Sequence, residues 1–162
     1  MLSTGIASEP LDIAAAIAQG SSPSSGGVAV FLGTVRESAA VTDNRAKPVT
    51  SLDYETHPQL APQRMKEICS EAEGKWQLND VVAVHRTGVC ELGEPTVVVV
   101  CGAVHRGDAL EACRYIIEEI KATVPIWKKE VYADGSSWVG AEGRVGGPGP
   151  DRVGGKAQGG RP

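Results

Sequence analysis

Two basic side chains stand where an apolar stretch of the chain gives way to a helical pattern. The stretch from Thr96 to Ala103 predicts a strand, and His105 and Arg106 follow it directly ahead of the helix. The backbone N–H groups and the positive dipole end of a helix N-terminus attract anions. We therefore expect His105 and Arg106 to bind a phosphate or a carboxylate. The alternative is an ordinary solvated loop before a helix.

Three more cationic residues stand at the ends of predicted elements. Lys121 lies near the end of the same helix, Lys128 follows that helix, and Arg36 ends an earlier strand. If these side chains gather, the crowding of like charges favours a neutral lysine, which can act as a base or a nucleophile. Taken one at a time, a lysine near a helix C-terminus or on an edge strand has a purely structural explanation. The residue types alone leave both interpretations open.

Other common chemistries lack the residues they need. A nucleophilic cysteine needs access to solvent, whereas Cys69 and Cys113 fall on apolar helix faces and Cys101 falls within an apolar strand. Cys101 and His105 have a loose metal-like spacing, but no second pair of ligands stands near them. Gly33 lacks the further glycines and the Lys-Ser/Thr pair of a phosphate loop. We therefore expect neither a metal nor a cofactor.

The charge balance argues against a nucleic-acid partner. The chain carries 16 Lys+Arg against 20 Asp+Glu, and without residues 140–162 the balance is 12 against 18. A nucleic-acid-binding protein usually presents a basic stripe. Basic residues set locally into an acidic body instead fit the capture of a small anion or of the C-terminus of a partner protein.

The cysteines and the apolar runs indicate the compartment. The four cysteines stand far apart without a CxxC pair, and no apolar run reaches the roughly 18 residues of a membrane span. No signal peptide is recognisable. We expect a reduced, cytoplasmic setting without contact to a membrane.

Hydrophobic periodicity predicts alternating groups of helices and strands. Two predicted helices cover residues 10–18 and 59–75, and a third starts after Arg106 and ends before Pro125, with Asp108 and Glu111 at the spacing of a capping box. The predicted strands cover residues 28–36, 50–56, 81–89, 96–104, 126–132 and 136–139. Residues 37–49 lack periodicity and are expected to form a loop that could act as a lid. This order favours an α+β domain over a doubly wound parallel sheet.

The chain divides into a domain and a tail by composition. Residues 1–139 hold the predicted elements and enough apolar side chains for one core. Residues 140–162 contain nine glycines and three prolines and hardly an apolar side chain. We expect residues 1–139 to form one domain and residues 140–162 to form a flexible tail.

Five separated segments, in order along the chain, resemble the large, catalytic subunit of molybdopterin synthase. They are Phe31-Leu32-Gly33-Thr34-Val35-Arg36, Leu52-Asp53-Tyr54-Glu55-Thr56-His57-Pro58, Val84-His85-Arg86-Thr87-Gly88, Ala103-Val104-His105-Arg106 and Lys121-Ala122-Thr123-Val124-Pro125-Ile126-Trp127-Lys128-Lys129-Glu130. The resemblance runs from about Val28 to Val139. Each segment alone is a weak signal, but five in register make a chance similarity unlikely.

The resemblance implies a fold, an assembly and a reaction. Such subunits have an α/β hammerhead-type fold with a mixed sheet and flanking helices, and they form a central homodimer within a heterotetramer. A small ubiquitin-like subunit at each outer end carries a C-terminal Gly-Gly thiocarboxylate, which enters the pocket of the large subunit and donates sulfur. The acceptor is cyclic pyranopterin monophosphate, and two transfers form the dithiolene of molybdopterin, a step of molybdenum cofactor biosynthesis.

The resemblance also implies roles for individual residues. Lys121 and Lys128 match the catalytic lysines. Arg36, His105 and Arg106 match ligands of the substrate or of the thiocarboxylate tail. Glu130 is expected to support them. An arginine usually follows the final Trp-Val in such subunits, and here either Arg144 replaces it or that contact is missing. All these groups are expected in one electropositive hollow, with Lys121 close to His105.

The same cations also suit two other functions. One is a non-catalytic module that binds a phosphorylated metabolite and uses the cations as ligands only. The other is a scaffold that captures a carboxylate-ended peptide. Formation of a dithiolene from a thiocarboxylated partner and the pterin would separate the enzyme from both.

Overall fold

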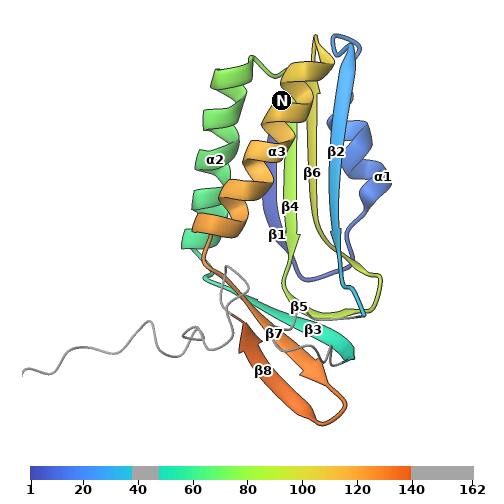
Figure 1. Ribbon diagram of the computed structural model, residues 1–162. Helices are drawn as coiled ribbons and strands as arrows, with labels where there is room; N and C mark the ends of the chain where they lie inside the picture. The colour runs from blue at the N-terminus through green and yellow to red at the C-terminus, as the bar shows by residue number, and fades with distance from the viewer. Residues whose placement is uncertain (38–47, 140–162) are drawn as a thin grey trace, which may run out of the picture.

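Two sheets carry the fold in the computed structural model, which describes residues 1–37 and 48–139 (Figure 1). Most of the loop predicted for residues 37–49 and all of the predicted tail, including Arg144, lie outside the described residues. Helices and strands mix as an α+β fold requires, so the predicted fold class is confirmed.

The first sheet forms the upper body of the molecule. Its strand order is β1 (Leu2–Ala7), β4 (Asp80–Arg86), β6 (Pro95–Ala103) and β2 (Gly27–Thr34). Only the β1 and β4 pair is parallel in this sheet. Strand β6 is buried from Thr96 to Ala103, because helices cover both faces of the sheet around it. Its uninterrupted apolar sequence therefore reflects a central position.

Three helices flank this sheet among the described residues. Helices α2 (Leu60–Trp76) and α3 (Arg106–Thr123) lie side by side on one face, and α1 (Ile13–Gln19) lies on the other (Figure 1). The core between α2, α3 and the sheet includes fully buried Met65, Ile68 and Ile116. The predicted amphipathic helices thus bury the faces that their periodicity indicated.

The second sheet lies across the lower end of the first (Figure 1). Its order is β5 (Gly88–Glu91), β3 (Val49–Thr56), β7 (Ile126–Tyr132) and β8 (Gly135–Val139), and the paired strands are antiparallel. A small core of Val35, Val49, Leu52 and Cys90 fills the junction. The chain enters β7 directly from the end of α3, so this helix leads into the second sheet.

The structure corrects three local predictions. Strand β1 was not predicted. The single strand predicted for residues 81–89 is two strands, because Gly88 has a φ of +85° and the chain turns there into the other sheet. The predicted capping box is wrong, since the helix begins at Arg106 with His105 as its N-cap, and this places Asp108 inside the first turn.

Arg86 holds the point where the chain passes from one sheet to the other. Its buried guanidinium donates from Nε to Oε1 of Glu94 over 3.1 Å, and further to the backbone oxygens of Ser8, Thr87 and Val89. The Thr87 hydroxyl then donates to the backbone oxygen of Tyr54 in β3 over 2.9 Å. This network fixes the two sheets against each other beside the groups described next.

Candidate active site

Strand β7 presents a lysine and a glutamate on one face of the second sheet. The ammonium of Lys128 lies 2.9 Å from Oε1 of Glu130, and the Tyr132 hydroxyl donates to Oε2 of the same carboxylate. Residues two apart in a strand share a face, which explains why these three side chains meet. The side chain of Glu130 is only 10% exposed and that of Lys128 is 30% exposed.

The surroundings of Glu130 keep it ionised. Burial alone would raise its pKa, but hydrogen bonds from Tyr132 and Lys128 and the charges of Lys128 and Arg36 together leave the pKa of Glu130 below its ordinary value. Glu130 is therefore a buried carboxylate held by cations. The resemblance gave it a supporting role, and its contacts fit that role.

Arg36 reaches this carboxylate from the end of β2. The preceding residue, Val35, is buried; its N–H donates to the backbone oxygen of Glu94 over 3.1 Å, and its oxygen accepts from Gly93 over 2.8 Å. Arg36 follows this anchor, is exposed, and lies close enough for its charge to act on Glu130.

Tyr54 connects the lysine strand to the first sheet. It pairs with Lys128 across the β3 and β7 ladder, and its ring meets the ring of His85 edge to face at a centroid distance of 5.1 Å. Burial, together with the nearby Cys90 and Glu130, raises the pKa of Tyr54, although a hydrogen bond with Thr96 opposes the shift. The phenol therefore stays neutral at physiological pH.

His85 lies at the end of β4 and is only 7% exposed. Its Nδ1 lies 2.7 Å from the backbone oxygen of Arg86. Burial, and to a lesser extent the charge of Lys121, lowers the pKa of His85 to about 4, against the effect of the Arg86 carbonyl. The ring is therefore neutral at physiological pH.

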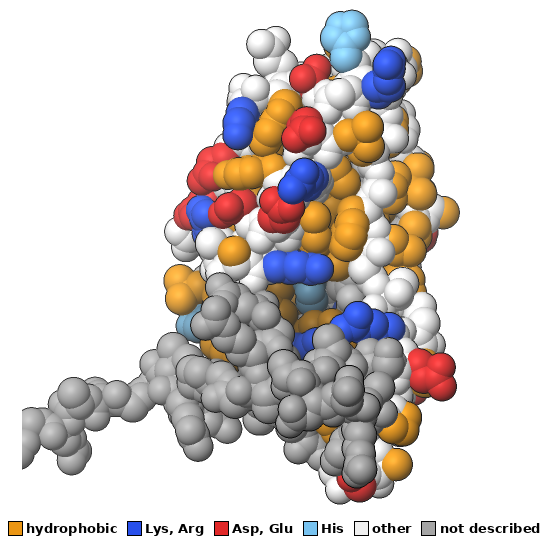
Figure 2. Space-filling view, viewed as in Figure 1, with side chains coloured by type: hydrophobic (Ala, Val, Ile, Leu, Met, Phe, Trp, Pro, Cys, Tyr) orange, Lys and Arg blue, Asp and Glu red, His pale blue; other side chains and the backbone are white. Residues whose placement is uncertain are grey.

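Lys121 reaches the same region from the last turn of α3. Its ammonium lies 5.6 Å from the ring centroid of Phe31 on β2, and its charge acts on His85. Figure 2 shows basic side chains and a histidine gathered at the lower end of the helices. Lys121 thus acts electrostatically on His85, the His85 ring meets Tyr54, and Tyr54 is the ladder partner of Lys128, which pairs with Glu130.

His105 and Arg106 do not join this group within one chain. They begin α3, whereas Lys121 lies 15 residues further along the same helix, about 22 Å away at 1.5 Å per residue. A histidine and a basic side chain mark the opposite, upper end of the molecule in Figure 2. The expectation that Lys121 lies close to His105 is therefore wrong for a single chain, because a straight helix separates them. The predicted site splits into a lower group of Arg36, Lys121, Lys128 and Glu130 and an upper pair.

Sequence reasoning gave no role to His85 or Tyr54. Both stand in segments that carry the resemblance, yet nothing in the residue types indicates that their rings meet between two sheets. The available signal was the position of His85 at the end of a run of apolar strand residues, Val81 to Val84, where a polar side chain needs a buried partner.

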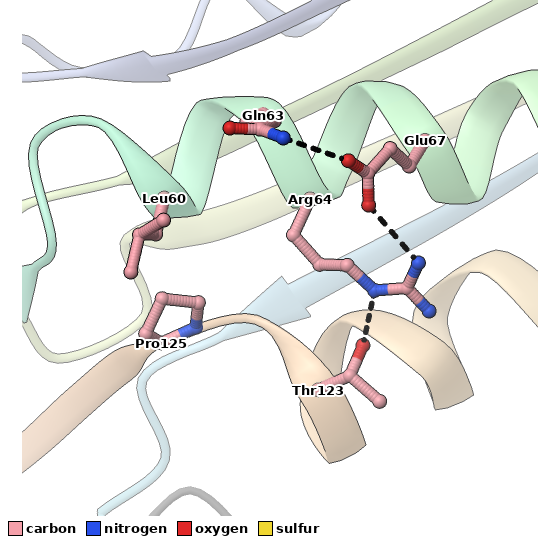
Figure 3. Close-up of a pocket in the computed structure, with 6 residues that line it drawn as sticks. All are labelled: Leu60, Gln63, Arg64, Glu67, Thr123 and Pro125. Carbon is pink, nitrogen blue, oxygen red and sulfur yellow. Dashed lines mark hydrogen bonds and ion pairs between the residues drawn. The ribbon is translucent and has the colours of Figure 1, made fainter.

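A pocket of about 330 Å³ lies between the first turns of α2 and the C-terminal end of α3 (Figure 3). It is lined by Leu60, Gln63, Arg64, Glu67, Thr123 and Pro125. The guanidinium of Arg64 donates to Thr123 over 3.1 Å and pairs with Glu67 at 3.3 Å, so its charge is neutralised inside the pocket wall. No predicted site residue lines this pocket, which we interpret as a gap between two helix ends.

The described residues offer neither a cluster of metal ligands nor a membrane-spanning helix. In residues 1–37 and 48–139, no group of three or more His, Cys, Asp or Glu side chains could hold a metal ion. All four cysteines are buried free thiols, which fits the prediction that they are not nucleophiles. None of the described helices has the length and apolar character needed to cross a membrane.

The chain belongs to the MoaE family, and its relatives include molybdopterin synthase catalytic subunits. The family model described as "MoaE protein" matches residues 6–123. The molybdopterin synthase catalytic subunit of Pyrococcus abyssi is 39% identical over 137 residues, which cover 85% of this chain and 89% of that protein. The chain spans between 57% and 89% of the length of the first two curated relatives it matches.

Two solved structures share the fold. Molybdopterin synthase from Staphylococcus aureus superposes with a TM-score of 0.76 at 34% identity and covers 83% of this chain and 95% of its own. A complex of subunits 1 and 2 of molybdopterin-converting factor from Helicobacter pylori gives a TM-score of 0.67 at 22% identity, with coverage of 87% and 92%. The second likeness supports the fold alone.

Proposed function

Because the chain belongs to the MoaE family, which includes the molybdopterin synthase catalytic subunits, we propose that it transfers sulfur to cyclic pyranopterin monophosphate. The donor is the C-terminal thiocarboxylate of a small ubiquitin-like subunit, and two transfers form the dithiolene of molybdopterin. We assign this activity to residues 1–139. The observation that carries the proposal is that Lys128 and Arg36 act on buried Glu130 while Lys121 acts on His85, whose ring meets Tyr54 in the strand next to Lys128.

The reaction needs cations more than it needs a nucleophile. The partner's thiocarboxylate sulfur adds to a carbonyl-type carbon of the substrate, and the oxygen of that carbon is protonated and leaves as water. A second water then hydrolyses the acyl bond, which leaves the sulfur on the substrate and a carboxylate on the tail. Negative charge develops on oxygen at each step, and fixed cations lower the energy of such intermediates. In this scheme Lys121 stabilises the oxyanion on the thiocarboxylate carbon, and Arg36 binds an anionic group of the substrate.

Lys128 and Glu130 are arranged for proton transfer. Their 2.9 Å ion pair supplies a donor and an acceptor beside the lysine of α3. Tyr132 holds the second carboxylate oxygen, so Glu130 is oriented as well as ionised. Lys128 therefore delivers a proton to the leaving group while Glu130 keeps the ammonium in place.

A homodimer would bring the separated cations together. Since α3 keeps His105 and Arg106 apart from Lys121 in one chain, a second copy is needed to deliver them to the same pocket. Edge strand β2 supports such an assembly, because Val28, Val30 and Leu32 are 39%, 43% and 40% exposed on one face. An antiparallel pairing of two β2 strands would place the start of one α3 beside the end of the other.

The partner and the compartment follow from the same proposal. The resemblance to molybdopterin synthase catalytic subunits implies a small ubiquitin-like partner subunit for this chain. Together they would form a heterotetramer. The four free thiols support a reducing, cytoplasmic setting.

A reconstituted reaction tests the proposed function. Purified chain, a thiocarboxylated small subunit and cyclic pyranopterin monophosphate should together yield the dithiolene. Lys121→Ala should abolish product formation while the small subunit still binds, because Lys121 acts on the reacting carbon and not on the partner's body. Lys66→Ala, at an exposed position on α2, is the matched control and should keep wild-type turnover. Tight substrate binding without turnover by the wild-type chain would favour the non-catalytic binding module.

A further inference from the structure

The hydrogen bond of His85 determines which ring nitrogen carries its proton. The backbone oxygen of Arg86, 2.7 Å from Nδ1, is an acceptor only, so Nδ1 must be the donor. A neutral imidazole has one proton to place, and Nε2 is therefore an unprotonated acceptor. The ring is too buried to become charged at physiological pH, which makes this tautomer persistent.

The free nitrogen of His85 has no hydrogen-bond partner among the described residues. Every side-chain nitrogen or oxygen sealed from solvent has a hydrogen-bond partner within the part of the chain that the structure describes. Since Nε2 is not such an atom, it keeps some exposure to solvent, although His85 as a whole is only 7% exposed. The charge of Lys121 acts on this ring and Tyr54 contacts its edge, so His85 lies among the residues of the candidate site.

Nε2 of His85 is a free hydrogen-bond acceptor among side chains that are donors or are already paired. Lys121, Lys128 and Arg36 can only donate hydrogen bonds, and both oxygens of Glu130 already accept from Lys128 and Tyr132. An anionic phosphate or thiocarboxylate gains nothing from a lone pair on nitrogen and will bind the cations instead. Nε2 therefore suits a neutral N–H or O–H donor, such as the edge of a nitrogen heterocycle.

We propose that His85 determines substrate specificity: its Nε2 accepts a hydrogen bond from an N–H group of the pterin ring and orients that ring beneath Lys121. The inference rests on the proposed function for the identity of the substrate. This hydrogen bond to Nε2 is a neutral contact that recognises the heterocycle, whereas the cations bind the anionic group of the substrate. A site that binds a buried donor in this way rejects analogues without it, because the acceptor would then be left unpaired.

Two substitutions of His85 separate this contact from the structural bond. In His85→Asn the amide N–H can still donate to the Arg86 oxygen, but no acceptor remains at the position of Nε2. In His85→Gln the amide oxygen can reach that position. We expect the KM for the pterin to rise roughly 3- to 10-fold in His85→Asn with kcat unchanged, and to return toward the wild-type value in His85→Gln. Thermal unfolding of both variants verifies that they fold.

Imidazole nitrogen NMR of the wild-type chain tests the contact without a variant. The chain has three histidines, so the His85 signals can be assigned with the His85→Asn variant. Addition of cyclic pyranopterin monophosphate should shift the Nε2 resonance, whereas inorganic phosphate should not. If the Nε2 chemical shift already indicates a hydrogen bond in the absence of ligand, the donor is Lys121. If Nε2 responds to the partner's tail peptide alone, the donor belongs to the tail. Either result, or an unchanged KM in His85→Asn, overturns the inference.

The two proposals fail in different ways. Absence of dithiolene from the wild-type reaction would refute the proposed function, while the NMR titration would still decide whether Nε2 meets the pterin. Normal wild-type turnover with a silent Nε2 resonance would refute only the role of His85.

Discussion

Replacing Lys128 by alanine should destabilise the fold as well as slow the reaction. The ammonium lies 2.9 Å from Glu130, whose side chain is 10% exposed, so its removal leaves a largely buried carboxylate with one hydrogen bond from Tyr132 and the charge of Arg36. An exposed ion pair contributes up to about 1 kcal/mol, and breaking a fully buried one costs about 3 to 5 kcal/mol. Since the Lys128 side chain is 30% exposed, we expect a loss of about 2 kcal/mol near neutral pH.

The pH dependence of this loss identifies its cause. The pKa of Glu130 is lowered in the folded chain despite its burial, so its ionisation adds stability above the ordinary glutamate value of 4.5. That contribution disappears as the pH falls through the lowered pKa. The difference in unfolding free energy between wild type and Lys128→Ala should therefore be largest at about pH 7 and should shrink toward about pH 4.

Urea denaturation at both pH values measures the effect, and a double-mutant cycle isolates it. In a Glu130→Gln background, Lys128→Ala should cost much less than in the wild type, because no carboxylate is left unpaired. Lys66→Ala, on the exposed face of α2, should change the unfolding free energy by less than about 0.5 kcal/mol. An equal cost of Lys128→Ala at both pH values and in both backgrounds would refute the reasoning.

Three further predictions follow from other parts of the structure. Arg86→Met should lower the unfolding free energy by about 3 kcal/mol in urea denaturation, because it removes the ion-pair partner of the partly buried Glu94 carboxylate and the donor to several backbone oxygens. A loss below about 1 kcal/mol would contradict the network described above. Gly27→Ala should lower the unfolding free energy by more than about 1 kcal/mol, because the added Cβ would lie 2.8 Å from the backbone at the start of α3. Gly74→Ala in α2 is the matched control: its Cβ meets open space, and it should raise the unfolding free energy by about 0.5 to 1 kcal/mol in the same assay. If two chains complete one pocket, a mixture of Arg106→Ala and Lys121→Ala chains should regain about one quarter of wild-type turnover, although each variant alone is inactive; full activity of Arg106→Ala would contradict the two-chain pocket.

The sequence predicts helices and strands well where apolar residues form an unbroken run along a strand or a continuous stripe on one face of a helix. The apolar run of β6 and the stripes of α2 and α3 show such signals, and their burial confirms them. Strand β1 has no such pattern, because its residues are only half-buried and its place depends on parallel pairing with β4. The split between β4 and β5 depends on the backbone conformation of Gly88, which an apolar run cannot reveal.

The site was predictable in part for similar reasons. Lys121 and Lys128 gather because β7 follows α3 almost at once, a proximity that chain order suggests. The error over His105 came from treating all cations as convergent, although the length of one helix already separates its two ends. The depth of His85 could not be predicted, since it arises from the packing of two sheets whose contact no local pattern encodes.

The candidate site straddles two sheets that share no backbone ladder in the described residues. Lys121 and His85 belong to the upper body, and Lys128, Glu130 and Tyr54 belong to the lower sheet. The spacing between the two lysines therefore depends on the short chain link from α3 into β7 and on a few side-chain contacts across the junction, chiefly those of Arg86, Thr87 and the two rings. Substitutions at these contacts can tilt one sheet against the other. They would then change the distance between the Lys121 and Lys128 ammonium groups while the strand register within each sheet stays the same.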